Sequence, residues 1–261
     1  KKIMSIPLIL ITNDDGIKSP GLRKLISIAN SIGKVVVVAP DGPRSAQSNA
    51  ITLEQPIRCD RVTIDKGRQI EYSCSGTPVD CVKLALNKIL DRKPDICLSG
   101  INHGSNASIN VIYSGTVSAA MEASINKIPS LAFSILDYSL DADFTESELF
   151  IKKIILKSLE NKISNNTCLN INIPKSIKSN KIKGMKVCNQ ASSKWVEQFN
   201  ERFDPRGNRY FWLSGDFIID DKTETSDEYF LKNQFISIVP VQYDLTSYES
   251  IDYVNSIFNN E

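Results

Sequence analysis

Two short, uninterrupted apolar runs constrain the fold more than any other feature: LILIT at residues 8–12 and VVVVAP at 35–40. Continuous hydrophobicity of this kind is typical of strands that are covered on both faces, as in a parallel sheet. Gly33 is placed to cap a helix between the two runs, where apolar residues recur at helical spacing, namely Leu22, Leu25, Ile26, Ala29 and Ile32. A strand, a helix and a strand in this order predict a βαβ unit.

The same alternation continues along the first half of the chain. We expect a β excursion over 51–74, a helix that begins at Thr77 and Pro78, a strand at 94–100, a helix that begins near 114–116, a strand at 131–136 and a helix at about 145–163. Beyond these the pattern is β-rich, with expected strands at 168–173, 181–187, 209–213 and 235–241. The predicted fold class is α/β, with a Rossmann-like, mostly parallel sheet, helices on both faces, and a β-rich C-terminal extension used in oligomerisation.

Residues 190–234 are polar and irregular, yet aromatic side chains are scattered through them: Trp195, Phe199, Phe203, Tyr210, Phe211, Trp212 and Tyr229. Aromatic residues on an arm outside the core are typical of an interface with another subunit. They could equally close over this chain's own core, and the sequence leaves both interpretations open. We expect one domain over residues 1–261, with a core at about 1–190 and an oligomerisation arm with C-terminal elements at about 191–261.

Composition excludes several classes of function. The net charge of +1 over 261 residues argues against a stable complex with nucleic acid, and no apolar run approaches the roughly 20 residues of a membrane span. We interpret the start, KKIMSIPLILI, as a first strand rather than a signal peptide, because its apolar part is short and lacks a small-residue cleavage site. The six cysteines form no CxxC pair, which favours free, mostly buried thiols in a reducing compartment.

A single histidine, His103, limits the chemistry further. A zinc site with several histidines is impossible, so any metal must be held mainly by oxygen ligands. His103 itself could be a structural residue at the surface or a proton donor.

Three polar loops follow predicted strands: NDDG at 13–16, DGPRSAQSN at 41–49 and SGINHGSN at 99–106. Ligands bind beyond the carboxyl ends of the strands in an open parallel sheet, so these loops are expected to converge. They contribute the carboxylates of Asp14 and Asp15 together with polar side chains of Ser45, Ser48, Asn49, Asn102, Ser105 and Asn106. This donor set suits Mg²⁺ or Mn²⁺. Each loop taken singly is also explained by polar turn residues that bond their own backbone.

The stretch YSGTVSAAMEA at 113–123 is a glycine-containing turn that opens a helix. Free N–H groups at that end, with the hydroxyls of Ser114 and Thr116, form a natural phosphate cradle. It is not a Walker A motif, because no GK[ST] is present, and an ordinary helix cap would also explain it. Beside an acidic metal site, such a cradle favours metal-assisted phosphoryl hydrolysis.

With these motifs assembled, the sequence resembles the SurE family, the survival-protein-E 5′/3′-nucleotidases. The residues that carry the resemblance are TNDDG at 12–16, APDGPRSAQSNAIT at 39–52, GTPVDCV at 76–82, PDICLSGINHGSN at 94–106 and VIYSGTVSAAMEA at 111–123, with later matches in DPRGN at 204–208 and VPVQYDLT at 239–246. The sequence departs from the family's pattern at 221–234, where DKTETSDEYFLKNQ replaces a usually glycine-containing segment.

The resemblance implies a metal-dependent 5′-nucleotidase that hydrolyses nucleoside 5′- and 3′-monophosphates, with one divalent ion, Mg²⁺ or Mn²⁺, in each subunit. It implies four metal ligands, which are Asp14, Asp15, Ser45 and Asn102. It places five residues near the substrate phosphate, which are Asn49, Asn106, Ser114, Gly115 and Thr116. It also implies a cytoplasmic homodimer or homotetramer whose subunits exchange C-terminal elements.

Our mechanistic hypothesis is attack by a metal-activated water that one of the two aspartates, Asp14 in preference to Asp15, orients or deprotonates. A covalent aspartyl-phosphatase is one alternative, although haloacid-dehalogenase-like enzymes use DxDGT and the two acids here are adjacent. A non-catalytic nucleotide-binding regulatory module is another, since binding needs the cradle but not two metal-binding acids. A dinucleotide-dependent oxidoreductase is disfavoured, because no GxGxxG follows the first strand.

Overall fold

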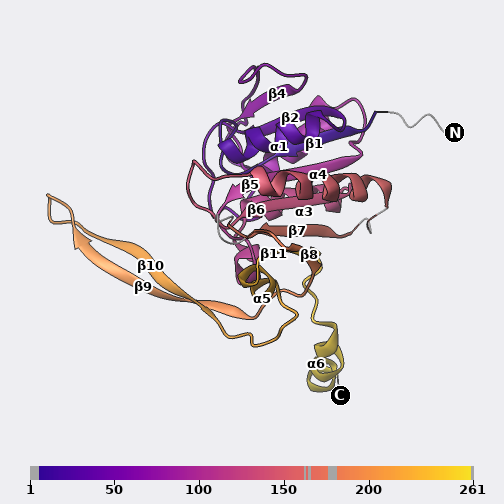
Figure 1. The fold of residues 1–261 in the computed structure, drawn as a ribbon. Coiled ribbons are helices and arrows are strands. Elements are labelled where there is room, and N and C mark those ends of the chain that lie inside the picture. The colour runs from indigo at the N-terminus through magenta and orange to yellow at the C-terminus, as the bar shows by residue number, and fades with distance from the viewer. Residues whose placement is uncertain (1–5, 162, 164–165, 176–180, 260–261) are drawn as a thin grey trace.

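A mostly parallel sheet of nine strands forms the centre of the molecule (Figure 1). The computed structural model describes residues 6–161, 163, 166–175 and 181–259. The strands of this sheet are β1 (Leu8–Thr12), β2 (Lys34–Pro40), β3 (Cys59–Val62), β4 (Ile70–Cys74), β5 (Ile96–His103), β6 (Ser130–Ile135), β7 (Cys168–Ile173), β8 (Gly184–Val187) and β11 (Phe235–Val241). Their order is β3-β4-β2-β1-β5-β6-β7-β11-β8, and neighbours run parallel except in the β3–β4 and β7–β11 pairs.

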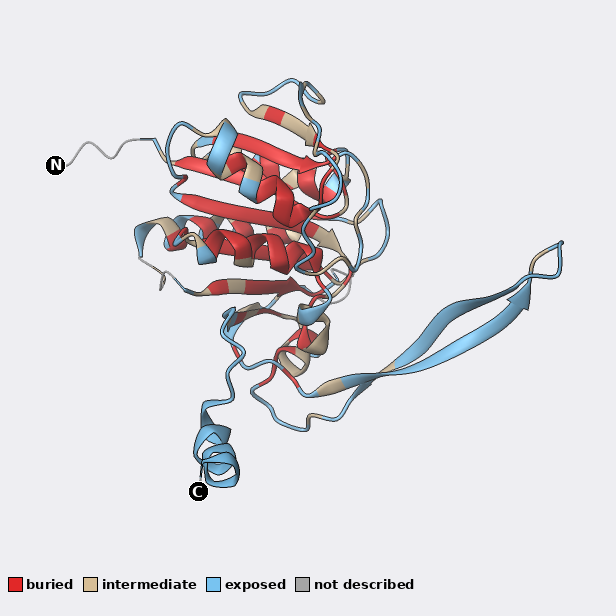
Figure 2. Ribbon diagram, turned by 180° about the vertical axis from the view of Figure 1, so that it is seen from behind, coloured by how far each residue is buried: buried red, intermediate tan, exposed pale blue. Residues whose placement is uncertain are grey.

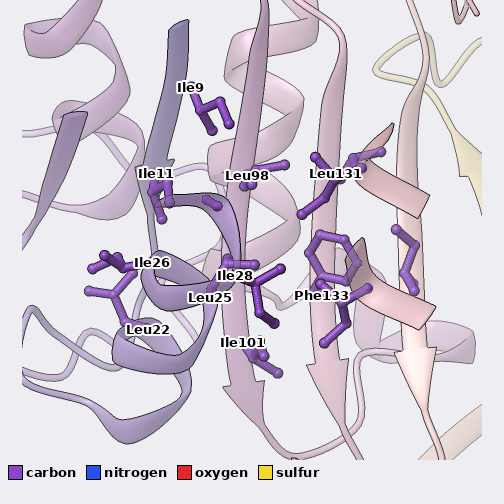
Figure 3. Packing of buried hydrophobic residues seen from close by; sticks show 14 of the residues in the cluster. Ile9, Ile11, Leu22, Leu25, Ile26, Ile28, Leu98, Ile101, Leu131 and Phe133 are labelled. Atoms are coloured by element: carbon purple, nitrogen blue, oxygen red, sulfur yellow. The ribbon is translucent and has the colours of Figure 1, made fainter. Parts of the chain in front are cut away.

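Helices cover both faces of the sheet, which confirms the predicted α/β architecture. Helices α1 (Pro20–Asn30) and α4 (Thr145–Glu160) pack with the side chains of Ile9 and Ile11, whereas α2 (Pro78–Leu84) and α3 (Gly115–Ile125) pack on the face of Leu10. Successive residues of a strand point to opposite faces, so the run LILIT supplies both cores at once. Figure 3 shows part of the first core, in which Ile9 and Ile11 of β1 lie near Leu25 of α1, and Phe133 of β6 continues the core across the sheet.

The caps of two helices test the sequence in detail. Helix α2 begins at Pro78 as predicted, and Thr77 and Asp80 form a reciprocal capping box. Helix α1, however, ends at Asn30 with Ser31 as its cap, so the predicted cap at Gly33 is wrong. Gly33 is needed for another reason: a Cβ there would lie 2.3 Å from the carbonyl oxygen of Pro7, where the chain enters β1.

The strand order reverses direction at β1. From β1 the chain runs outward to β2, continues to β3 at the edge of the sheet and comes back to β4 beside β2, and then it crosses to β5 on the opposite side of β1. The loops that leave β1 and β5 therefore diverge, and such a switch point is where ligands bind in open α/β sheets. Strand β5 is longer than predicted: its pairing with β6 shifts register after Ser99, and Asn102 and His103 still pair with Ser134 and Ile135.

Residues 190–234 are not irregular, and this prediction is wrong. They form strands β9 (Ser193–Phe203) and β10 (Arg209–Ile219), which pair along their whole length, and helix α5 (Asp227–Lys232). The ribbon of β9 and β10 projects from the body of the molecule (Figure 1), and most of its residues are exposed (Figure 2). A ribbon that buries neither face within its own chain carries no alternating apolar pattern, which is why the two strands were not predicted in full.

The exposed aromatic residues resolve one open alternative. Six aromatic side chains of the ribbon are exposed in this chain, with Phe199 at 69% and Trp212 at 66%, and the set also includes Trp195, Phe203, Tyr210 and Phe211. They do not close over this chain's own core. The C-terminal helix α6 (Ile251–Phe258) likewise has no buried residue.

Strand β11 joins the central sheet between β7 and β8, so the sheet extends past the boundary expected near residue 190.

All six cysteines are free, and five of them are buried, as the sequence predicted. Within the part of the chain that the structure describes, no helix is long and apolar enough to cross a membrane.

Candidate active site

The turn after β1 directs Asp14 and Asp15 out of the sheet. The Nδ2 group of Asn13 closes this turn by donating to the carbonyl oxygen of Gly16 at 3.0 Å and to Ser19 Oγ at 2.8 Å. Gly16 has φ +95°, and a Cβ on it would lie 2.9 Å from the backbone of Gly42. Glycine is therefore required here both for its conformation and for the close approach of the next loop.

Asp14 is almost completely buried, with 5% of its surface exposed, and it meets the beginning of α3. The hydroxyl of Thr116 donates a hydrogen bond to Asp14 Oδ1. A Cβ on Gly115 would lie 2.8 Å from Asp14 Cβ, so only glycine lets the helix approach this closely. Burial, followed by the charge of Asp15, raises the pKa of Asp14 to about 7, although the hydrogen bonds from Thr116 oppose that rise.

Asp15 joins the end of β1 to the end of β5. The backbone N–H of His103 donates to Asp15 Oδ2 at 3.3 Å, and burial raises the pKa of Asp15. The Nδ2 group of the adjacent residue, Asn102, donates to the carbonyl oxygen of Gly104 at 3.0 Å, so the atom with which Asn102 would bind a cation is Oδ1. Asp15 and Asn102, two of the predicted metal ligands, thus lie at the switch point.

The loop after β2 reaches the same place. The backbone N–H of Arg44 donates to the carbonyl oxygen of Asp14 at 2.7 Å, which brings Ser45, an exposed residue, next to the turn. Ser48 has φ +46°, and its hydroxyl donates to the carbonyl oxygen of Ile112 at 2.6 Å. The loop is therefore held at one end to Asp14 and at the other to the segment that precedes α3.

Asn49 is exposed and lies at the edge of the site rather than inside it. It lines a cavity of about 710 Å³ whose other walls include Ile112 and Met121. Asn49 follows Ser48, which is bonded to the segment before α3. Among the described residues, no hydrogen bond joins Asn49 to Ser114, Gly115 or Thr116.

Asn106 belongs to a buried polar cluster that the sequence did not predict. Its Nδ2 group donates to Ser134 Oγ at 2.8 Å, and its backbone N–H donates to Asn172 Oδ1 at 2.9 Å. Asn170 donates to the carbonyl oxygen of Asn106 and accepts a bond from Asn172. The signal was present in CLNINI at 168–173, where two asparagines alternate with apolar residues and so share one face of a strand.

The hydroxyls at the start of α3 already form hydrogen bonds within the protein. Ser114 is the N-cap, and its Oγ accepts the N–H of Val117 at 3.0 Å. The hydroxyl of Thr116 is used by Asp14. The donors that this helix start offers to an anion are therefore chiefly its first backbone N–H groups, Gly115 foremost, because helix geometry gives them no partner within the helix.

His103 is packed rather than free at the surface. Its Nδ1 lies 2.8 Å from the carbonyl oxygen of Ser139, which fixes Nδ1 as the donor, and its ring meets Phe144 edge-on at 5.8 Å. Its Nε2 is buried close to the backbone of Gly21. These contacts give His103 a structural role, while its backbone serves Asp15.

The donor set fits a hard divalent cation. No lysine, arginine or histidine forms an ion pair with Asp14 or Asp15 in the described ranges, although the two carboxylates raise the cost of each other's charge. The same ranges contain no cluster of three or more His, Cys, Asp or Glu side chains that could hold a metal. Neutral oxygens are the remaining candidates for further ligands. Ser45 follows Arg44, which bonds to Asp14, and Asn102 precedes His103, which bonds to Asp15.

Comparison with known proteins agrees with the fold and with the motifs at the site. The family described as "Survival protein SurE" matches residues 9–197. The chain is 52% identical over 253 residues to 5′-nucleotidase SurE of Flavobacterium psychrophilum, which covers 97% of this chain and 98% of that protein. It is 53% identical over 250 residues to 5′-nucleotidase SurE of Flavobacterium johnsoniae, with 96% of each chain covered.

A solved structure gives the same answer. The crystal structure of the SurE protein from Aquifex aeolicus matches with a TM-score of 0.81 and 36% sequence identity, over 96% of this chain and 99% of that chain. The two relatives and the solved structure each match this chain over nearly its whole length. The chain belongs to the SurE family.

Proposed function

We propose that this protein is a metal-dependent 5′-nucleotidase that hydrolyses nucleoside 5′-monophosphates, and 3′-monophosphates, to nucleoside and phosphate. The observation that carries the proposal is the pair Asp14 and Asp15, which lies at the switch point of the sheet, against the start of α3 and without a cationic partner among the described residues. Relatives at about half identity over nearly the full chain carry the name 5′-nucleotidase SurE, which supports the same assignment.

Four residues would hold one Mg²⁺ or Mn²⁺ ion: Asp14, Asp15, Ser45 and Asn102. When bound, such an ion neutralises phosphate charge and lowers the pKa of a water molecule. Thr116 donates to Oδ1 of Asp14, and Oδ2 lies beside Gly115 at the proposed phosphate position, so Asp14 is the better placed of the two acids to orient the attacking water and accept its proton.

The phosphate would lie at the start of α3, where the N–H of Gly115 and the positive end of the helix dipole stabilise its oxygens. Ser114 and Thr116 shape this cradle through their cap and carboxylate contacts. Asn49 contributes from the rim. Asn106 would offer the phosphate the second N–H of its Nδ2 group, because the first donates to Ser134 Oγ and holds the side chain in place.

The proposed function is tested by phosphate release from a panel of nucleoside monophosphates. We expect turnover of AMP and other nucleotides by the protein with Mg²⁺ or Mn²⁺, no turnover after treatment with EDTA, and recovery when the ion is returned. Nucleotide binding without phosphate release would favour the regulatory module instead. A phosphorylated aspartate trapped by acid quenching would favour the covalent aspartyl-phosphatase.

Replacing Asp14 by asparagine should remove catalysis without harming the fold. The variant Asp14→Asn keeps the shape and the Thr116 contact, but it loses the negative charge, so we expect kcat to fall by roughly 100-fold or more. Its melting temperature should equal or exceed that of the parent, because the repulsion with Asp15 is gone. Asp91→Asn, at an exposed site, is the control, and full activity of Asp14→Asn contradicts the mechanism.

The close approach of α3 to Asp14 gives an independent prediction. In Gly115→Ala the new methyl group would lie 2.8 Å from Asp14 Cβ and 3.0 Å from Oδ2, inside a buried site. The helix start and the carboxylate must move apart, and we expect kcat/KM to fall by about tenfold or more. The matched variant is Gly42→Ala, whose Cβ would meet no atom within 4 Å. Equal kinetics of the two variants would exclude this geometry.

We propose further that the protein is a homodimer or homotetramer in the cytoplasm. An oligomer is supported by the exposed aromatic residues of the β9–β10 ribbon and by the apolar face of α6, on which Ile251, Val254 and Phe258 are all exposed. Isolated apolar surfaces of this kind are stable when a second copy covers them. Six free cysteines support a reducing compartment.

Light scattering on the purified protein tests the assembly. We expect the mass of two or four chains, and we expect Val254→Glu to shift the protein toward smaller species because it places a charge on the apolar face of α6. Asp252→Asn on the same helix should leave the mass unchanged. A monomer in the parent protein contradicts the proposal.

A further inference from the structure

Asp227 is a buried acid that no step of the proposed reaction uses. None of its surface is exposed, and its carboxylate accepts three backbone N–H groups: that of Ser108 on Oδ2 at 2.8 Å, and those of Ala191 and Glu228 on Oδ1, both at 2.9 Å. Its own N–H donates to the carbonyl oxygen of Asn189 at 2.8 Å. Asp227 thus ties together three segments that are far apart in the sequence.

The first of these segments leads into the active site. Ser108 begins the 3₁₀ helix η2 (Ser108–Ile112), which ends two residues before the cap of α3. Ile112 at its far end accepts the hydroxyl of Ser48, and Asn106 on its near side is fixed by the polar cluster on β6 and β7. Helix η2 is therefore the connection between the loop after β5, the loop after β2 and the phosphate cradle.

The second segment is the base of the β9–β10 ribbon. Ala191 lies two residues before β9, and its carbonyl oxygen accepts the hydroxyl of Ser108 at 2.8 Å. Ser193, the first residue of β9, bonds through its hydroxyl to the hydroxyl of Ser108 and to the N–H of Ile109. The indole N–H of Trp195 donates to Asn110 Oδ1 at 2.9 Å. Every one of these contacts joins η2 to the ribbon.

The backbone at Ser108 needs this support. Ser108 has φ +56°, a left-handed conformation that residues with a side chain seldom adopt, and it is completely buried. Such a conformation persists only where the surroundings fix it, and here a carboxylate holds its N–H while the ribbon holds its hydroxyl.

We propose that Asp227 is a positioning residue for the phosphate site: its carboxylate locks η2 to the base of the ribbon and so fixes the start of α3 relative to Asp14. This proposal rests on the proposed nucleotidase function for its kinetic consequence, but not for its structural one. It also gives a role to the segment at 221–234, in which the sequence departs from the family's pattern.

An amide cannot replace this carboxylate. The two oxygens of Asp227 accept on opposite sides, toward Ser108 and toward Ala191 with Glu228. In Asp227→Asn one of those oxygens becomes an NH₂ group that faces an N–H donor, so at least one backbone donor loses its acceptor. The variant has the same size as the parent residue, and it therefore tests the hydrogen bonds rather than the packing.

The test combines amide hydrogen exchange with steady-state kinetics on the full-length protein. In Asp227→Asn we expect exchange in a peptide that spans residues 104–116 to be faster by about tenfold or more, while peptides of β1 and β2 are unchanged. With AMP as substrate and the metal ion present, well below the melting temperature, we expect kcat to fall by about tenfold and by more than KM changes.

Two further variants sharpen the result. Ser193→Ala removes the bonds of the ribbon to Ser108 and Ile109, so its effects should be in the same direction and should not add to those of Asp227→Asn. Asp220→Asn, at the exposed end of β10, breaks the ion pair with Lys194 without touching η2, and it should match the parent.

Each outcome decides the proposal. Unchanged exchange at 104–116, or faster exchange with parental kcat and KM, overturns it. A lower melting temperature with parental kinetics at a temperature where the variant is folded also overturns it, because that result shows a purely structural role. If the parent protein fails to release phosphate, the function proposed above fails, and the exchange experiment still tests the lock between η2 and the ribbon.

Discussion

The structure of the site depends on one energetically unfavourable arrangement: the buried carboxylate of Asp14 lies beside a second carboxylate, that of Asp15. Burial and the charge of Asp15 both oppose ionisation of Asp14, and the start of α3 only partly offsets that cost. The arrangement requires glycine at two places. Gly115 lets the helix approach the carboxylate, and Gly16 lets the turn approach the next loop. A cation bound here would stabilise the two negative charges, which the chain alone leaves unfavourable. The cost of ionising Asp14 is thereby connected to the proposed metal-dependent chemistry.

Topology explains why the costly pair lies where it does. Strand β1 has β2 on one side and β5 on the other, and the loops that leave β1 and β5 lead to helices on opposite faces of the sheet, which makes the carboxyl end of β1 a switch point. Hydrogen bonds then draw the three loops together: the backbone N–H of Arg44 donates to the carbonyl oxygen of Asp14, and the backbone N–H of His103 donates to the carboxylate of Asp15. The turn after β1 is thus the point at which the other two loops meet.

The sequence predicted the features that have a local cause. Strands covered on both faces, the cap at Thr77 and the start of α3 all follow from short patterns, and the structure confirms them. The ribbon of β9 and β10 could not be predicted in full, since its pairing buries no face within the chain and leaves no periodicity to read. The polar partners of Asn106 were missed because hydrogen bonds between β6, β7 and a loop have no signature beyond the alternation of Asn170 and Asn172.

Three buried acids show why residue type alone does not settle a role. Asp80 is also buried, but bonds from Thr52 and Thr77 occupy both of its oxygens and outweigh burial, so its pKa is lowered, and it serves the helix cap and holds Thr52.

Asp227 accepts three backbone N–H groups on its two oxygens, one of them from a residue 119 positions away, and these bonds give it a structural use. Asp14 differs from both, because Thr116 is its side-chain partner on one oxygen and a like charge is its neighbour. An acid held in that way, at the switch point of the sheet, retains the lone pairs with which it can bind a cation or accept a proton.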